Sequence, residues 1–168
     1  MRARHPGEHA GTEADAAVTD TPGCTVVVRT ADCVPIVVLG HRSVAVVHAG
    51  WKGLLAGVVA RAADALRDLG DEPRVAHLGP CIRPGCYEFD GPERVQMMDR
   101  FGVAAGARTT WDAPALDLPR VARIALAEAG VPLVVDSSGC TACDDRWFSH
   151  RARAEAGRFA TRAWLAET

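Results

Sequence analysis

Three residues that can carry chemistry flank a pair of apolar runs. Asp32 and Cys33 stand just before the run Val34–Leu39, and His48 stands just after the run Val44–Val47. A short turn sequence, Gly-His-Arg-Ser, separates the runs and indicates a β-hairpin. Because one strand of a hairpin begins where the next one ends, we expect Cys33 and His48 to be neighbours. A thiol and an imidazole so placed can be metal ligands, a nucleophile with its base, or packing residues.

A catalytic zinc ion takes three protein ligands and leaves an open position for water, whose pKa the metal lowers toward neutrality. Cys33 and His48 would supply two of these ligands. The other histidines are the internal candidates for the third: His5, His9, His41, His77 and His150. We expect Asp32 either to orient a ligand or to accept a proton.

Cationic and aromatic residues elsewhere are candidates for substrate contacts. Lys52 lies in the segment Gly50–Gly53, directly before a helical pattern, and Arg151 lies near the carboxyl end. The free N–H groups at such a helix start could hold an anion beside His48, or the glycines could simply form a tight turn. Tyr87 follows a loop rich in proline and glycine, where it could position a substrate or close the loop by hydrogen bonding.

Two further cysteine pairs invite a structural zinc interpretation, which their context opposes. Cys81 and Cys86 are separated by four residues, a longer spacing than a typical zinc knuckle has. Cys140 and Cys143 have the shorter spacing but no zinc-ribbon flanks, and no thioredoxin-like unit precedes them. We therefore expect neither a four-cysteine zinc site nor a redox motif.

Apolar periodicity outlines the elements that would position these residues. The expected strands cover 25–29, 34–39, 44–47, 74–78 and 132–136. Helical patterns cover 54–69, 92–101 and 117–129, a connector covers 102–110, and a last helix is expected from 148 to 164. Because strands and helices are mixed without a steady alternation, the pattern favours the α+β class over a doubly wound sheet.

Composition narrows the class of protein. With 168 residues, 48% of them hydrophobic, the chain can form one domain over 1–168 with a substantial core. A net charge of −2 argues against non-specific nucleic-acid binding. Its apolar runs are shorter than the roughly 20 residues that cross a bilayer, so we expect no membrane association. Without a signal-peptide pattern, the six cysteines are expected to be free thiols or metal ligands, in a protein with a cytoplasmic location.

Five groups of motif residues occur in order along the chain. They are Thr30–Pro35, Val46–Gly53, Leu78–Pro80 with Tyr87-Glu88, Cys140-Thr141, and Phe148–Arg151 with Gly157-Arg158. In this order they resemble the YfiH-like family, also called the laccase-domain, polyphenol-oxidase or multicopper-oxidase-type family. The resemblance runs from about Asp15 to the carboxyl end.

The resemblance implies a layered α+β fold with mixed, largely antiparallel central sheets flanked by helices. It implies zinc bound through Cys33 and His48, with a second histidine from a Gln-Val-His-Gly motif near the amino terminus. Copper is the second choice, because none of the histidines lies in a His-x-His pair. The implied partners are a purine nucleoside and phosphate. The implied reactions are phosphorolysis of adenosine, inosine, guanosine or methylthioadenosine, and deamination of adenosine.

The sequence departs from the family pattern at two places. The Gln-Val-His-Gly motif is absent from these residues, and neither His5 nor His9 matches it, so we expect an N-terminally short member. Ala152 stands where a second arginine is usual, and Arg153 stands where an acidic residue is common.

Three functional hypotheses follow. The first is a zinc enzyme with the catalytic residues Asp32, Cys33 and His48. Its residues for phosphate and substrate would be Lys52, Tyr87 and Arg151. The second is a catalytically impaired member with a structural or binding role, for which a homo-oligomer stays open. The third is a metal-free hydrolase in which His48 activates the Cys33 thiol.

Overall fold

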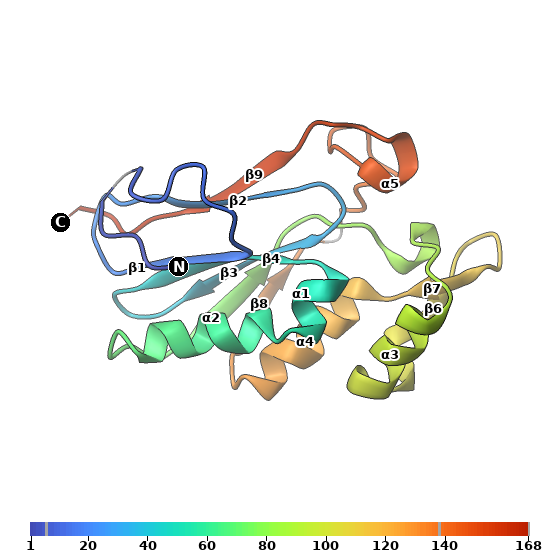
Figure 1. The fold of residues 1–168 in the computed structure, drawn as a ribbon, viewed down its shortest axis with the longest axis horizontal. Helices are drawn as coiled ribbons and strands as arrows, with labels where there is room; N and C mark the ends of the chain where they lie inside the picture. Colours follow the sequence, from blue (N-terminus) through green and yellow to red (C-terminus); the bar gives the residue numbers. More distant parts are fainter. Residues whose placement is uncertain (6, 138, 168) are drawn as a thin grey trace.

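A five-stranded mixed sheet forms the centre of the computed structural model, which describes residues 1–5, 7–137 and 139–167. Its strand order is β1-β4-β3-β5-β8 (Figure 1). The strands are β1 (Ala16–Thr19), β3 (Val34–Leu39), β4 (Val44–Ala49), β5 (Val75–Leu78) and β8 (Leu133–Asp136). All neighbours pair antiparallel except β5 and β8, which are parallel.

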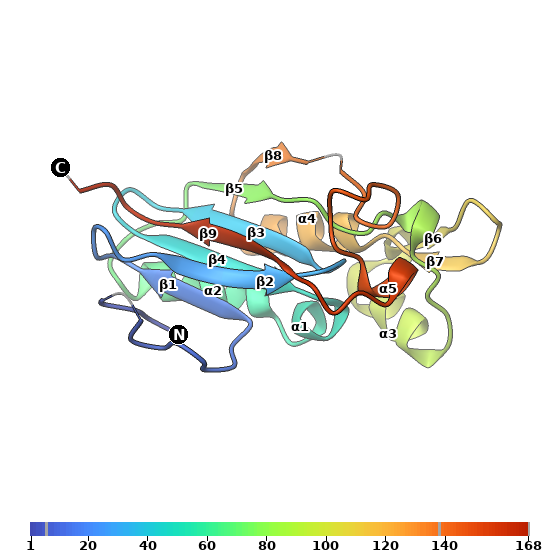
Figure 2. The same ribbon diagram turned by 90° about the horizontal axis from the view of Figure 1, so that it is seen from above.

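A two-stranded ribbon and a layer of helices cover opposite faces of this sheet (Figures 1 and 2). The ribbon pairs β2 (Val26–Thr30) with β9 (Phe159–Ala163) in antiparallel register. The helices are α1 (Trp51–Leu55), α2 (Val58–Arg67) and α4 (Leu118–Glu128). The chain therefore has three layers and the predicted α+β class, which is confirmed.

Strand β4 explains why both faces need cover. Val44 and Val46 pack with the ribbon, whereas Ala45 and Val47 pack toward the helices, and all four side chains are fully buried. Alternate residues of a strand point to opposite faces. A run that is apolar at every position is stable only when both faces are covered. Two hydrophobic clusters accordingly lie on the two sides of the sheet.

The remaining elements gather at the end of the sheet where β4 passes into α1 (Figures 1 and 2). They are the 3-10 turns η1 (Pro84–Cys86) and η2 (Val103–Ala105), the helices α3 (Pro92–Phe101) and α5 (His150–Arg153), and the short pair β6 (Gly106–Arg108) and β7 (Pro114–Leu116). In the described part of the chain, no helix combines the length and the hydropathy that crossing a membrane requires.

Several sequence-based elements are confirmed. The hairpin strands β3 and β4 and the helix α3 lie where the apolar runs place them. Asp117 caps α4, since its carboxylate accepts a hydrogen bond from the Arg120 N–H at 3.0 Å.

Three predictions about elements are wrong. The helix expected over 54–69 breaks between α1 and α2, because Gly57 adopts a left-handed conformation with φ of 76°. The helix expected from 148 to 164 ends at Arg153, and its second half is the strand β9. That strand forms because β2 offers it a partner edge, from Val26 opposite Ala163 to Thr30 opposite Phe159. The expected connector also contains β6.

A buried carboxylate holds the turn between β3 and β4. Asp71 accepts hydrogen bonds from the N–H groups of His41 and Arg42, at 3.1 and 2.9 Å, and from Ser43 Oγ at 2.7 Å. Burial raises the pKa of Asp71, but the hydrogen bonds from Ser43, Arg42 and His41 outweigh it and lower this pKa to about 2. The hairpin that orients Cys33 and His48 thus depends on an ionised side chain.

Protonation of Asp71 should therefore destabilise the fold. Its folded pKa lies below the ordinary value of 3.8, so its contribution is complete above about pH 4 and is lost as the pH falls toward 2. The shift corresponds to about 2 kcal/mol. We expect Asp71→Asn to lower the free energy of unfolding at neutral pH by about 1–3 kcal/mol in urea denaturation. Asp99→Asn, a change at an exposed carboxylate, is the control. Equal stability of the two variants would contradict the assignment.

Candidate functional site

Cys33 and His48 meet at one end of the central hairpin. Pro35 pairs with His48 and Val34 pairs with Ala49, so Cys33 lies beside the residue that follows β4. That residue is Gly50. A Cβ atom there would lie 3.0 Å from Cys33 Sγ and 3.8 Å from His48 Nε2. The thiol and the imidazole therefore converge over a glycine whose missing side chain leaves them room, as the hairpin argument predicts.

Asp15 fixes the orientation of the His48 ring. Its carboxylate lies 2.8 Å from His48 Nδ1, and its backbone carbonyl accepts the His48 N–H at 2.7 Å. With Nδ1 engaged by a carboxylate, Nε2 is the ring atom left for a ligand. Carboxylate–histidine pairs of this kind hold the ligand tautomer in metal sites. Sequence reasoning missed Asp15, whose only signal was that the family resemblance begins near it.

The Cys33 thiol is largely enclosed and carries its proton at neutral pH. Burial raises its pKa to about 11, and the charges of Asp32 and Asp15 raise it further, against the opposing effect of Arg158 and Arg151. A thiol in this environment is a poor nucleophile by itself, since the thiolate is the reactive form. A bound metal cation reverses this balance by displacing the proton.

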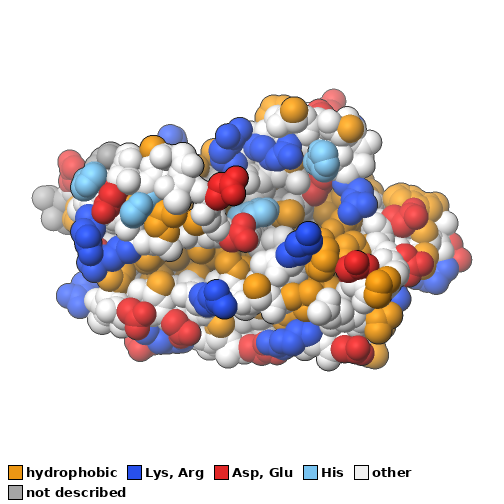
Figure 3. Space-filling view, in the orientation of Figure 1, with side chains coloured by type: hydrophobic (Ala, Val, Ile, Leu, Met, Phe, Trp, Pro, Cys, Tyr) orange, Lys and Arg blue, Asp and Glu red, His pale blue; other side chains and the backbone are white. Residues whose placement is uncertain are grey.

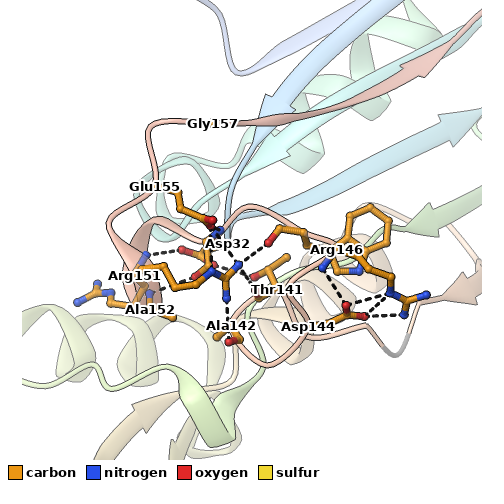
Figure 4. Close-up of polar contacts among 12 residues, drawn as sticks. Asp32, Thr141, Ala142, Asp144, Arg146, Arg151, Ala152, Glu155 and Gly157 are labelled. Atoms are coloured by element: carbon orange, nitrogen blue, oxygen red, sulfur yellow. Dashed lines mark hydrogen bonds and ion pairs between the residues drawn. The ribbon is translucent and has the colours of Figure 1, made fainter.

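Asp32 holds the carboxyl-terminal loop, residues 141–151, against the start of β3 (Figure 4). Its Oδ1 accepts hydrogen bonds from Thr141 Oγ1 and Ser149 Oγ, and its Oδ2 accepts one from the Arg151 N–H, each at 2.7 Å. The side chain is buried, and its backbone φ is 85°, a strained value for a residue other than glycine. These three bonds satisfy the carboxylate, so Asp32 holds the Arg151 backbone beside the residue that precedes Cys33.

Arg153, at a position where the sequence departs from the family pattern, stabilises the same loop. Its guanidinium donates to the carbonyl oxygens of Thr141 and Ala142, at 3.3 and 3.1 Å, and to Trp147 O. Glu155 accepts from Arg153 Nε at 3.1 Å and from the Ser149 N–H at 2.6 Å. The departure thus brings a set of contacts of its own, which motif comparison did not predict.

Arg151 lies between this network and an open cavity. Its guanidinium carbon is 5.1 Å from the centre of the buried Tyr87 ring, a cation–π contact. Burial raises the pKa of Tyr87, so its hydroxyl stays protonated. The cavity has a volume of about 720 Å³, and Phe89, Trp111 and Arg151 are among its lining residues. Lys and Arg side chains gather over α5 on this side of the molecule (Figure 3).

Lys52 takes a different position. Its Nζ lies 5.4 Å from the ring of its neighbour Trp51, which in turn contacts Phe89 edge to face at 5.6 Å between centroids. Within the described residues, Lys52 is not part of the cavity lining. The contact between Trp51 and Phe89 therefore links the start of α1 to the cavity. Lys52 lies against Trp51 and not in the cavity lining.

A third ligand for Cys33 and His48 is not found among residues 1–5, 7–137 and 139–167, where the only group of three metal-ligand side chains lies elsewhere. His9 Nε2 instead lies 2.7 Å from the Arg2 carbonyl oxygen. The donor types and the orientation of His48 fit two of the three ligands that a catalytic zinc takes.

The group of three consists of Cys86, Cys140 and Cys143, whose sulfur atoms all lie within 4.8 Å of one another. These thiols could hold a metal ion, as a three-cysteine group that the sequence analysis did not consider. The spacing could not indicate it because Cys86 reaches the other two across the fold rather than along the chain. Cys81, the fourth cysteine considered, is buried and does not belong to the group.

Loss of the Asp15 carboxylate should weaken metal binding at Cys33 and His48. We expect Asp15→Ala to lower the zinc affinity of this pair by about 10- to 100-fold, because the ring loses the partner that orients it. Glu13→Ala, at a neighbouring exposed carboxylate that lines the same surface cavity as Asp15, should leave the affinity unchanged. Both are measured by zinc titration against a chromophoric chelator in a Cys86→Ser/Cys143→Ser background. Equal affinities for the two variants would sink the assignment.

Residues 2–166 match the family model described as multi-copper polyphenol oxidoreductase laccase. Among curated relatives, purine nucleoside phosphorylase from Xylella fastidiosa is 40% identical over 162 residues, covering 90% of this chain and 61% of the relative. Purine nucleoside phosphorylase SCO2081 from Streptomyces coelicolor is 38% identical, with coverage of 90% and 64%. Purine nucleoside phosphorylase YfiH from Escherichia coli is 35% identical, with coverage of 94% and 66%. The chain thus spans less than two thirds of each of these relatives.

Solved structures agree with this relationship. YlmD from Geobacillus stearothermophilus superimposes with a TM-score of 0.81 at 29% identity, covering 92% of this chain and 62% of that one. The hypothetical protein YfiH from Bacillus licheniformis gives a TM-score of 0.80 at 31% identity, with coverage of 90% and 61%. The fold, the ordered motifs and the family match over residues 2–166 agree: this chain belongs to the laccase-domain family that includes the YfiH proteins.

Proposed function

We propose that this chain carries the zinc-dependent site of a purine nucleoside phosphorylase that also deaminates adenosine. The observation that carries the proposal is the convergence of Cys33 Sγ and His48 Nε2 over Gly50, with Asp15 orienting the imidazole. Curated relatives named purine nucleoside phosphorylase support an enzyme of this family. Deamination, zinc and the nucleoside preference remain parts of the proposal.

Cys33 and His48 would hold the metal ion. Zinc bound there supplies Lewis-acid chemistry and a water molecule of lowered pKa, which suits attack on a purine ring carbon. Asp32 would keep the thiol in place through the loop contacts of Thr141 and Ser149.

Phosphate and nucleoside would bind on the Arg151 side. The Asp32 carboxylate fixes the Arg151 backbone, and the Tyr87 ring lies against its guanidinium, so the cation is ordered before a ligand arrives. A guanidinium binds phosphate oxygens in a planar, bidentate manner. Phe89 and Trp111 line the same cavity, and a purine bound there would pack against them. During phosphorolysis a phosphate oxygen would attack ribose C1′ while the base leaves and takes up a proton.

A thiol hydrolase is the second candidate. In a cysteine enzyme, Asp15 would orient the imidazole, His48 would be the base and Cys33 would be the nucleophile. Against it, burial holds the pKa of Cys33 at about 11, far above the range of activated catalytic thiols. The zinc enzyme is therefore favoured.

The test incubates the protein with adenosine or inosine, once with phosphate and once without. Chromatography then measures the free base and the ribose 1-phosphate that are released. We expect zinc-loaded protein to be active and Cys33→Ala to lose activity by at least about 100-fold, because a metal ligand is gone. Cys24→Ser, a change at a buried thiol in the other hydrophobic cluster, should keep the activity.

Two results would decide against the proposal. The first is that folded, zinc-loaded protein releases no more base or inosine than the Cys33→Ala variant does. That result would favour the non-catalytic hypothesis. Activity that survives chelators but is abolished when iodoacetamide alkylates Cys33 would favour the thiol hydrolase.

A further inference from the structure

Three thiols from two separate loops form a cluster that the proposed reaction does not use. Cys86 ends the 3-10 turn η1. Cys140 and Cys143 stand at the two ends of a tight turn, with Cys143 57 residues after Cys86. Their sulfur atoms lie within 4.8 Å of one another, and Cys86 Sγ is 2.9 Å from Cys143 Sγ. The cluster includes neither Cys33 nor His48.

Backbone hydrogen bonds fix both loops, so the meeting of the thiols follows from the fold. Cys81 and Cys140 form a parallel bridge, in which the Thr141 N–H donates to the Cys81 carbonyl at 3.2 Å. The Cys143 N–H donates to the Cys140 carbonyl at 3.2 Å, which closes the turn. On the other loop, the Cys86 N–H donates to the Arg83 carbonyl at 2.9 Å.

The surroundings of Cys140 favour a thiolate there. The Arg83 N–H donates to Cys140 Sγ at 3.4 Å, a contact that stabilises negative charge on the sulfur. Arg153 binds the carbonyl oxygens of Thr141 and Ala142 inside the turn and brings a positive charge to it. Cys86 and Cys140 are half-buried and Cys143 is exposed, so an ion could enter from solvent.

We propose that Cys86, Cys140 and Cys143 form a second metal site, which binds Zn²⁺ through three thiolates and leaves the fourth position to water. Soft thiolate ligands select zinc and other thiophilic cations over Mg²⁺ or Ca²⁺. Zn–S bonds of about 2.3 Å in a tetrahedron place sulfur atoms about 3.8 Å apart, so small side-chain movements complete the geometry. Each thiol that binds releases its proton to solvent, and the three-thiolate complex carries one negative charge.

Metal at this site would connect two loops of the Arg151 cavity. Thr141 lies between Cys140 and Cys143 and donates its hydroxyl hydrogen to Asp32 at 2.7 Å. Cys86 lines the cavity itself and precedes Tyr87. A metal ion held by all three thiols would therefore tie these two loops together and rigidify them, apart from the chemistry proposed at Cys33 and His48.

The experiment separates this site from the Cys33–His48 pair. Reduced, metal-free Cys33→Ser/His48→Ala protein is titrated with Zn²⁺ against a chromophoric chelator and with Co²⁺ by absorption spectroscopy. We expect one equivalent of tightly bound zinc and an intense sulfur-to-cobalt charge-transfer band. Adding Cys143→Ser should weaken that band and lower the zinc affinity at least tenfold, whereas adding Cys24→Ser should change neither.

Because Cys143 is exposed, we expect the Cys143→Ser variant to fold, and circular dichroism of each variant checks this. No zinc binding in the Cys33→Ser/His48→Ala background would overturn the proposal. So would a charge-transfer band of unchanged intensity after Cys143→Ser. Recovery of Cys86 and Cys143 as a disulfide from protein purified under reducing conditions, with no zinc uptake, would also overturn it.

Discussion

The Asp32 carboxylate is the interaction on which the candidate site depends. It joins the start of β3 to residues more than a hundred positions further along the chain, through hydrogen bonds from Thr141, Ser149 and Arg151. A buried carboxylate is stable only when such donors satisfy it, so removing one partner leaves an unpaired polar group in the core. Because Cys33 follows Asp32 directly, the same contacts hold the Arg151 backbone near the start of β3 where Cys33 stands.

Local patterns in the sequence were sufficient to predict the hairpin at the centre of the fold. The runs around Val34–Leu39 and Val44–Val47 are apolar at every position, and a hairpin of such strands brings Cys33 and His48 together. The Asp117 cap and the helix α3 are local as well, and they lie where the sequence places them. The proximity of Cys33 and His48 could therefore be predicted from the sequence.

Features that depend on partners far along the chain could not be predicted from the sequence. Phe159–Ala163 is a strand only because β2 pairs with it, and its own sequence reads equally well as the end of a helix. Asp15 gains its role from the approach of His48, and Arg153 gains its role from three carbonyl groups on the neighbouring turn. The cluster of Cys86, Cys140 and Cys143 likewise arises from two loops, and chain spacing alone could not indicate it.

The central claim is that Cys33 and His48 bind a metal ion together. Anomalous diffraction at the zinc edge, from crystals of the zinc-loaded protein, tests it most directly. The account predicts a peak about 2.3 Å from Cys33 Sγ and about 2.0–2.1 Å from His48 Nε2. Zinc elsewhere in the map, with no peak between these two atoms, would contradict it.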